Sequence, residues 1–186
     1  MKTIALFGGS FDPPHIAHEA IVKALLSEED IDKVIVMPTY LNPFKLQSFA
    51  PSELRLQWLK EIFADYENVE INDFEVSKGE KVPTIKSVKY LLKKYKKIYL
   101  VIGADNLKTL YKWKNFEELE KLVTFIVVSR QEIKIPKNFM RLNINVDISS
   151  STLRQSIDKT KLPQKCAVEI QKYYKEKNAN KNRSDN

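Results

Sequence analysis

The segment TIALFGGSFDPPHIAH, residues 3–18, joins an apolar run to two adjacent glycines and then to both histidines of the chain. Residues 3–7 are almost wholly apolar, as expected of a strand that is covered on both faces. Glycine lets the backbone approach a ligand closely, and a helix start offers free N–H groups. We therefore predict a strand, a turn at Gly8 and Gly9, and a helix that begins at His15, an arrangement that can hold phosphates.

The composition bounds the size and class of the protein. The chain has 186 residues, of which 43% are hydrophobic, and this is enough for one sizeable core. We predict one domain over residues 1–178 and a flexible basic and polar tail over residues 179–186. The lone Cys166 excludes an intrachain disulfide, and no apolar run has the length of a membrane span or a signal peptide. The sequence thus predicts a cytoplasmic protein without a membrane partner, as a monomer or weak homo-oligomer.

The charge favours a partner that carries phosphates. Lys and Arg number 31 against 24 Asp and Glu, for a formal net charge of +7. A basic nucleic-acid-binding domain is one alternative, encouraged by the lysine-rich run at residues 93–97. Such a run at a helix end is usually a solvated surface, and the chain has no RNP, KH or helix-turn-helix signature. We therefore expect no nucleic-acid partner.

Short β-branched runs alternate with helical patterns along the whole chain, which predicts an α/β protein with a doubly wound, mostly parallel sheet. The predicted strands are residues 3–7, 34–37, 69–74, 98–102, 123–128 and 142–146. The predicted helices are residues 15–26, 52–63, 84–94, 115–122, 150–157 and 164–175. In such a sheet ligands bind beyond the carboxyl ends of the strands, near the point where the strand order reverses.

A second cluster of polar residues, Ile-Ser-Ser-Ser-Thr-Leu-Arg at 148–154, follows the last predicted strand. Alone it indicates a capped helix with a solvated arginine. Together with the first segment it predicts two anion-binding helix starts at one sheet edge, with a triphosphate between them. A zinc site at His15 and His18 is disfavoured, because only Cys166 remains as a soft ligand and it falls in a late helix.

These two segments resemble the end motifs of the HxGH-type nucleotidyltransferases, which are similar to Gly-Ser-Phe-Asp-Pro-x-His-x-Gly-His and Ile-Ser-Ser-Thr-x-x-Arg. Within that superfamily the chain is similar to the bacterial nicotinate-nucleotide adenylyltransferases. The supporting residues are Pro38, Pro43, Lys45, Gly103, Ala104, Asp105, Leu110 and Trp113. The resemblance implies a Rossmann-like nucleotidyltransferase fold and transfer of the adenylyl group of ATP to nicotinate mononucleotide, a step of NAD biosynthesis.

The resemblance also implies roles for individual residues. The catalytic set would be His15, His18, Arg154 and Lys45. The ATP-binding set would be Gly8, Gly9, Ser10, Phe11, His15, His18, Gly103, Asp105, Ile148, Ser149, Ser150 and Arg154. The acceptor would contact Thr84, Trp113 and Lys45. The resemblance implies Mg²⁺ as cofactor, held through the phosphates of ATP rather than by protein ligands.

Two departures from the family pattern bear on these roles. Ala17 stands where the family usually has glycine, and we expect its methyl group to narrow the clearance near the ligand. Residues 82–87 read Val-Pro-Thr-Ile-Lys-Ser, where the family is commonly similar to Ser-Tyr-Thr-x-Asp-Thr. The acceptor pocket therefore differs most from the family, and nicotinamide mononucleotide and phosphopantetheine remain alternative acceptors.

Overall fold

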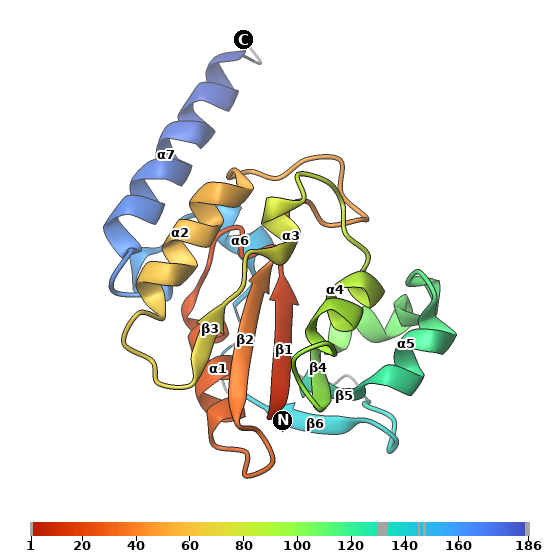
Figure 1. Cartoon of the computed structure of the whole chain (residues 1–186). Helices are drawn as coiled ribbons and strands as arrows, with labels where there is room; N and C mark the ends of the chain where they lie inside the picture. The colour runs from red at the N-terminus through yellow and green to blue at the C-terminus, as the bar shows by residue number, and fades with distance from the viewer. Residues whose placement is uncertain (1, 130–133, 145, 147, 185–186) are drawn as a thin grey trace.

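The computed structural model describes residues 2–129, 134–144, 146 and 148–184, with side chains inside the last helix described as far as Asn180. Six parallel strands form one sheet in the order β3-β2-β1-β4-β5-β6, and helices cover both of its faces (Figure 1). The strands are β1 (Thr3–Gly9), β2 (Lys33–Pro38), β3 (Val69–Ile71), β4 (Lys97–Gly103), β5 (Thr124–Ser129) and β6 (Met140–Asn143). The predicted α/β class and doubly wound sheet are confirmed.

The helices alternate with the strands along the chain. The α-helices are α1 (Ile16–Leu26), α2 (Ser52–Ile62), α3 (Phe74–Ser77), α4 (Thr84–Leu91), α5 (Phe116–Leu122), α6 (Ser150–Gln155) and α7 (Ala167–Ser184). Three 3₁₀ turns, η1 (Ala104–Lys108), η2 (Leu110–Lys112) and η3 (Lys159–Lys161), complete the connections among the described residues. Since β1 has β2 on one side and β4 on the other, the strand order reverses between β1 and β4.

Alternate side chains of the central strands enter two separate cores. Ala5 and Phe7 of β1 pack on the side of α1, α2 and α7, whereas Ile4 and Leu6 pack on the side of α4 and α5. Successive side chains of a strand point to opposite faces, so a strand buried on both faces must be apolar throughout. This requirement explains the unbroken apolar run that begins the sequence.

Helix α7, the last helix, is hydrogen-bonded to the loop after β1 and to α2. Tyr174 of α7 is fully buried and donates its hydroxyl hydrogen bond to the carboxylate of Asp12, in the loop after β1. Trp58 of α2 donates from its indole Nε1 to Glu169 of α7 at 2.9 Å. Burial and the negative charge of Asp12 raise the pKa of Tyr174, so this hydroxyl remains a donor.

The predicted turn at Gly8 and Gly9 is wrong. Gly8 and Gly9 belong to β1, where they pair with Met37 and Pro38 of β2, and the chain turns only afterwards, at residues 10–14. The pairing with β2 is a tertiary contact, and it outweighs the local tendency of two glycines to form a turn.

The predicted strand at residues 69–74 is also corrected, because β3 ends at Ile71 and Phe74 begins helix α3. The side chain of Asn72 accepts the backbone N–H of Phe74 at 3.1 Å, a local bond that ends the strand. The Phe74 ring then stacks on Tyr90 of α4 at 4.1 Å.

The last elements differ in extent from the sequence prediction. Strand β6 covers Met140–Asn143 instead of 142–146, of which residue 145 lies outside the described residues. Helix α7 continues to Ser184, beyond the predicted end at 175 and into the segment expected as a tail. The division at residue 178 stays a prediction. No helix among the described residues has the length and apolar character to span a bilayer.

We expect Tyr174→Phe to lower the free energy of unfolding by about 1–3 kcal/mol, because a buried carboxylate loses a hydrogen bond. The matched control is Tyr173→Phe, whose half-buried hydroxyl donates to the carbonyl of Phe49 at 3.2 Å. This control should lose about 1 kcal/mol or less. Urea unfolding of both variants measures the difference, and equal losses would contradict the role given to Asp12.

Candidate active site

A cavity of about 390 Å³ lies at the carboxyl ends of β1 and β4, where the strand order reverses. This is the place at which doubly wound sheets bind ligands. Five of the predicted site residues line its wall: Gly8, Gly9, Thr84, Gly103 and Trp113. The structure therefore brings the predicted glycines and two of the three predicted acceptor residues, Thr84 and Trp113, to one cavity, whereas Lys45 is not among the residues that line it.

The glycine at the end of β4 leaves room for a carboxylate. A Cβ atom built on Gly103 would lie 2.4 Å from Oδ1 of Asp105, so this carboxylate occupies the space that a side chain would need. Asp105 is exposed in η1, and the N-cap of that turn is Gly103. Asp105 therefore does not cap this turn.

Two buried polar atoms in the cavity wall have no hydrogen-bond partner among the described residues: Thr39 Oγ1 and Trp113 Nε1. Such atoms are rare in folded proteins, and each one calls for a bound polar group or water. Trp113 also packs against the core beside α4 and α5. Its indole thus contributes both to the core and to the wall of a polar binding site.

The two histidines stack face to face at the start of α1. Their ring centroids are 3.6 Å apart with 19° between the planes. His15 is buried and is the N-cap of the helix, while Nδ1 of His18 accepts the backbone N–H of His15 at 3.1 Å. An accepting Nδ1 assigns the proton of a neutral His18 ring to Nε2.

The C-terminal motif is tied directly to the loop that precedes these histidines. Arg154 of α6 donates to the backbone carbonyl of Asp12, and Ser150 Oγ donates to the carbonyl of Pro13 at 2.9 Å. The Arg154 guanidinium also donates to Ser151 Oγ at 3.0 Å and lies over the ring of Phe49 at 4.7 Å. The structure thus brings the two predicted anion-binding segments together.

Lys45 lies in the loop after β2 and has an exposed side chain. Partial burial of its ammonium group lowers the pKa of Lys45, and the positive charge of Arg154 lowers it further. The repulsion indicates that the two cations share one region. Two cations held close together favour an anion between them.

Three other predicted residues contribute backbone or capping groups rather than free side chains. Phe11 and Ile148 are buried in the core, so only their backbone groups remain for a ligand. Ser149 is the N-cap of α6, and its Oγ accepts the backbone N–H of Thr152 at 3.1 Å. Ala17 is fully buried in the same core, and the expectation that its methyl group approaches the ligand is wrong.

The sequence did not predict a role for Arg55, which is fully buried on α2. Its guanidinium donates to four backbone carbonyls, those of Ser10, Thr39, Tyr40 and Ala50. These carbonyls belong to the loop after β1 and to the loop after β2, so one side chain holds both loops in place. Its position in an apolar helical pattern gave no local signal of this role.

The sequence also did not predict a role for Glu75 of α3. This carboxyl group is 6% exposed, lines the cavity and accepts a hydrogen bond from Ser87 Oγ at 2.6 Å. Burial raises the pKa of Glu75 to about 7, and the bond from Ser87 partly opposes that rise. The carboxyl group therefore changes charge near neutral pH.

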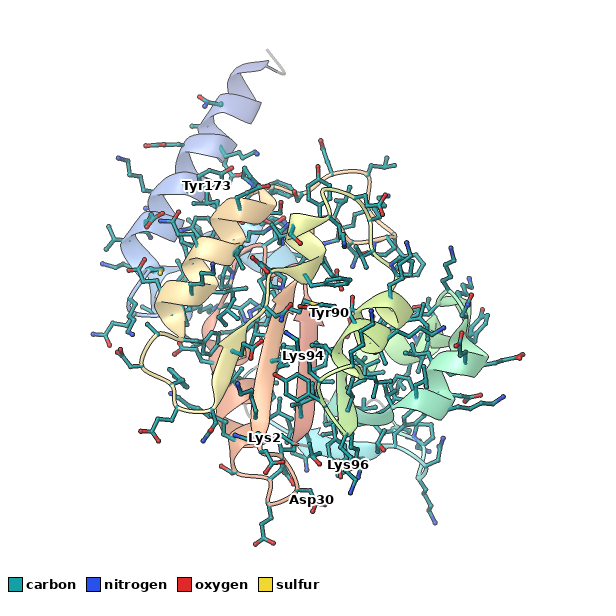
Figure 2. All side chains as sticks on the ribbon, in the orientation of Figure 1. Lys2, Asp30, Tyr90, Lys94, Lys96 and Tyr173 are labelled. Atoms are coloured by element: carbon teal, nitrogen blue, oxygen red, sulfur yellow. The ribbon has the colours of Figure 1, made fainter. Side chains whose placement is uncertain are left out.

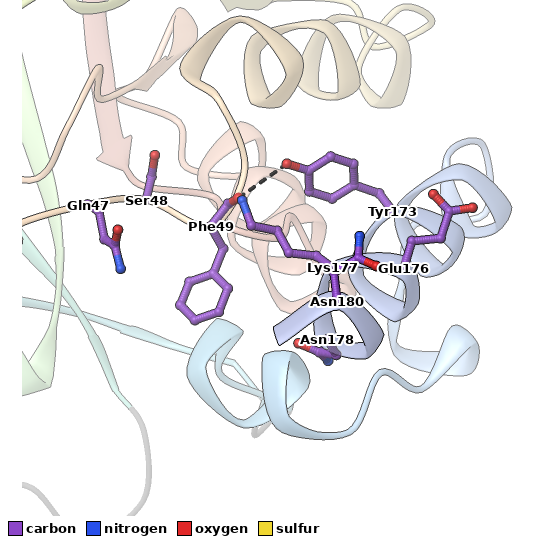
Figure 3. A pocket seen from close by; sticks show the side chains of 8 residues that line it. All are labelled: Gln47, Ser48, Phe49, Tyr173, Glu176, Lys177, Asn178 and Asn180. Atoms are coloured by element: carbon purple, nitrogen blue, oxygen red, sulfur yellow. Dashed lines mark hydrogen bonds between the residues drawn. The ribbon is translucent and has the colours of Figure 1, made fainter. Parts of the chain in front are cut away.

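A second cavity, of about 590 Å³, lies between residues 47–49 and helix α7 (Figure 3). Tyr173 and Lys177 both donate to the backbone carbonyl of Phe49 at its edge. None of the predicted site residues lines it. Its polar groups serve mainly to hold the loop after β2 against α7.

The lysine-rich run between α4 and β4 is a solvated surface. Its four lysines are exposed. Figure 2 shows Lys94 below Tyr90, near the middle of the view, and Lys96 at the lower end of the molecule. Lys94 lies over the ring of Tyr90 at 5.7 Å, and Lys97 over that of Tyr99 at 4.2 Å. Two of the four lysines thus contact aromatic rings of the chain itself. The absence of a nucleic-acid partner stays a prediction.

Residues 6–156 match the model of the cytidylyltransferase-like family, which is a class of nucleotidyltransferases. A "probable nicotinate-nucleotide adenylyltransferase" of Sulfurimonas denitrificans is 57% identical over 176 residues, covering 95% of this chain and 97% of the relative. One of the same description from Campylobacter fetus subsp. fetus is 49% identical and covers 95% and 98%. The chain belongs to the nicotinate-nucleotide adenylyltransferase family, as its motifs predicted.

Solved structures support the fold. The nicotinic acid mononucleotide adenylyltransferase of Plasmodium falciparum, solved in complex with NaAD, has a TM-score of 0.79 and 24% identity to this chain. That comparison covers 96% of this chain and 98% of the other. The predicted single-domain nucleotidyltransferase fold is therefore confirmed.

We expect Arg55→Met to lower the free energy of unfolding by about 2–5 kcal/mol, because several buried carbonyls lose their donor together. The control is Lys60→Met, an exposed position on the same helix that should change little. Urea unfolding reports the loss. Limited proteolysis should also cut residues 39–51 faster in Arg55→Met, and unchanged cleavage would show that Arg55 does not hold that loop.

Proposed function

We propose that this chain joins ATP and nicotinate mononucleotide, giving nicotinate adenine dinucleotide and pyrophosphate. A phosphate oxygen of the mononucleotide attacks the α-phosphorus of ATP, and the bond from the α-phosphorus to the bridging oxygen breaks. The electron pair leaves with pyrophosphate. The family membership and the cavity at the sheet switch point support this reaction, which we expect to take place in the cytoplasm, where ATP is available.

One observation carries the proposal: Arg154 and Ser150 bind the carbonyls of residues 12 and 13, beside the stacked histidines. A triphosphate that contacts the first segment therefore also lies within reach of the second. Two segments separated by more than a hundred residues have no other evident reason to place imidazole, hydroxyl and guanidinium groups at one sheet edge. Their combined chemistry suits a chain of phosphates.

The reaction needs charge stabilisation and alignment more than proton transfer. A phosphate monoester has its second pKa at about 6, so the attacking group is largely an anion at neutral pH. In this proposal the imidazole of His18, the guanidinium of Arg154 and the ammonium of Lys45 offset the charge that develops on the phosphates. His15 holds the ring of His18 by stacking.

Mg²⁺ enters this proposal with the phosphates of ATP. The described residues contain no group of three or more His, Cys, Asp or Glu side chains that could hold a metal ion. The cationic residues around the phosphate region fit phosphate-bound rather than protein-bound metal. When bound, the ion would neutralise part of the phosphate charge.

The acceptor ring fits the part of the cavity between Thr84 and Trp113. The indole offers an aromatic face and a buried Nε1–H without a protein partner among the described residues. Two cationic residues, Lys112 and Lys114, line the same cavity. These groups favour a carboxylate on the ring over a neutral amide. Adenylyl transfer to phosphopantetheine is a less favoured alternative, since that acceptor has no aromatic ring to use Trp113.

We expect His18→Ala and Arg154→Ala each to lower kcat by about 10²–10³, the usual effect of removing one donor to a transition state. Arg141→Ala, at an exposed position of β6, serves as the charge-matched control and should keep wild-type turnover. Pyrophosphate release from ATP and Mg²⁺ is the assay, with circular dichroism to verify folding. A well-folded His18→Ala protein with wild-type kcat would overturn the assignment.

The kcat/KM for nicotinate mononucleotide should exceed that for nicotinamide mononucleotide by about tenfold or more, since one lost charge-assisted hydrogen bond corresponds to that factor. The same pyrophosphate assay at saturating ATP compares the two acceptors, with phosphopantetheine as a third. Equal values for the first two would remove the preference for the acid.

A further inference from the structure

Glu75 is an acidic side chain in the wall of a cavity that, on the proposed function, receives an acidic ligand. Glu75 is 6% exposed, and buried apolar residues such as Met37 and Val82 line the same cavity. Among the described residues its carboxyl bonds only to Ser87 Oγ. A permanent negative charge here would repel the carboxylate of nicotinate, so the protonation state of Glu75 bears directly on which acceptor can bind.

We propose that Glu75 is a specificity-determining residue of the acceptor site. Its neutral form admits the carboxylate of nicotinate mononucleotide, and its ionised form disfavours that carboxylate while tolerating the amide of the nicotinamide analogue. A neutral carboxyl group can donate a hydrogen bond to a carboxylate oxygen, whereas an ionised one only accepts. The inference rests on the proposed function and deepens it.

Burial, rather than a neighbouring charge, determines the protonation state of Glu75. Helix α3 packs against β2 and α2, and Ser87 reaches it from α4. The charged groups of these elements are engaged or exposed: Arg55 binds backbone carbonyls, Lys33 pairs with Glu70, Lys89 pairs with Glu118, and Glu53, Lys60, Glu61 and Lys86 are exposed. On either side of Glu75, Asp73 and Lys78 are exposed, and Lys112 and Lys114, which are also exposed, line the same cavity.

The pKa of about 7 gives the proposal a measurable consequence. The neutral fraction of Glu75 falls from about 90% near pH 6 to about 10% near pH 8. The KM for nicotinate mononucleotide should therefore rise roughly ninefold over that range, relative to the KM for nicotinamide mononucleotide. Both acceptors carry the same 5′-phosphate, so the titration of that group cancels in the ratio.

The test compares wild type with Glu75→Gln, a neutral side chain of nearly the same shape. In Glu75→Gln the ratio of the two KM values should stay constant between pH 6 and pH 8. The control is Glu80→Gln, at an exposed position of the same connection, which should keep the wild-type pH dependence. A Glu75→Gln variant with the wild-type profile would overturn the proposal, while the adenylyl transfer itself would stand.

A measurement on the wild-type protein covers the case in which Glu75→Gln does not fold. Calorimetric titration near pH 7.5, in buffers of different ionisation enthalpy, counts the protons taken up with each acceptor. Binding of the acid form should take up about half a proton or more beyond binding of the amide form, because a bound carboxylate favours neutral Glu75. Equal proton uptake would overturn the proposal. Absence of binding and turnover with every acceptor would instead overturn the proposed function.

Discussion

The buried carboxylate of Asp12 is the contact on which the arrangement of the site depends. It accepts the backbone N–H groups of Phe49 and Ala50, at 2.7 and 3.0 Å, and the hydroxyl of Tyr174. Its own backbone carbonyl accepts the guanidinium of Arg154. One residue therefore joins the loop after β1, the loop after β2 and the two last helices. A buried carboxylate is stable only when its oxygens are hydrogen-bonded, so the loop after β2 and α7 must both meet the loop after β1. The bond from Arg154 to the Asp12 carbonyl adds α6.

The meeting of these segments at Asp12 also positions positively charged side chains where the proposed reaction has its phosphates. Arg55 holds the carbonyls of the two loops in place, and Arg154 of α6 donates to a carbonyl of the loop after β1. The guanidinium of Arg154 is thus positioned before any ligand binds, and binding need not include the cost of ordering it. Preorganised charge is more effective than mobile charge, because little reorganisation accompanies the reaction.

The sequence predicted those parts of the fold that local pattern determines. Unbroken apolar runs located the four central strands, because strands covered on both faces cannot alternate. The same approach failed where distant residues decide the outcome. Gly8 and Gly9 join β1 through pairing with β2, and Phe74 starts a helix after a bond to Asn72. Helix α3 has only four residues, too few for a periodic signal.

The residues of the site also fall into two groups, those that local sequence predicts and those that depend on distant contacts. Histidines and glycines gathered in one segment were visible in sequence, because their chemistry and their spacing coincide. Arg55 and Glu75 were not visible, since each is ordinary in its own helix and gains its role only from partners elsewhere in the chain. Glu75 shows why such residues matter: the cavity that desolvates it is also the cavity that would hold the acceptor ring. The features that bury the carboxyl group are therefore the same features that couple its charge to the choice of ligand, and neither property could be altered without the other.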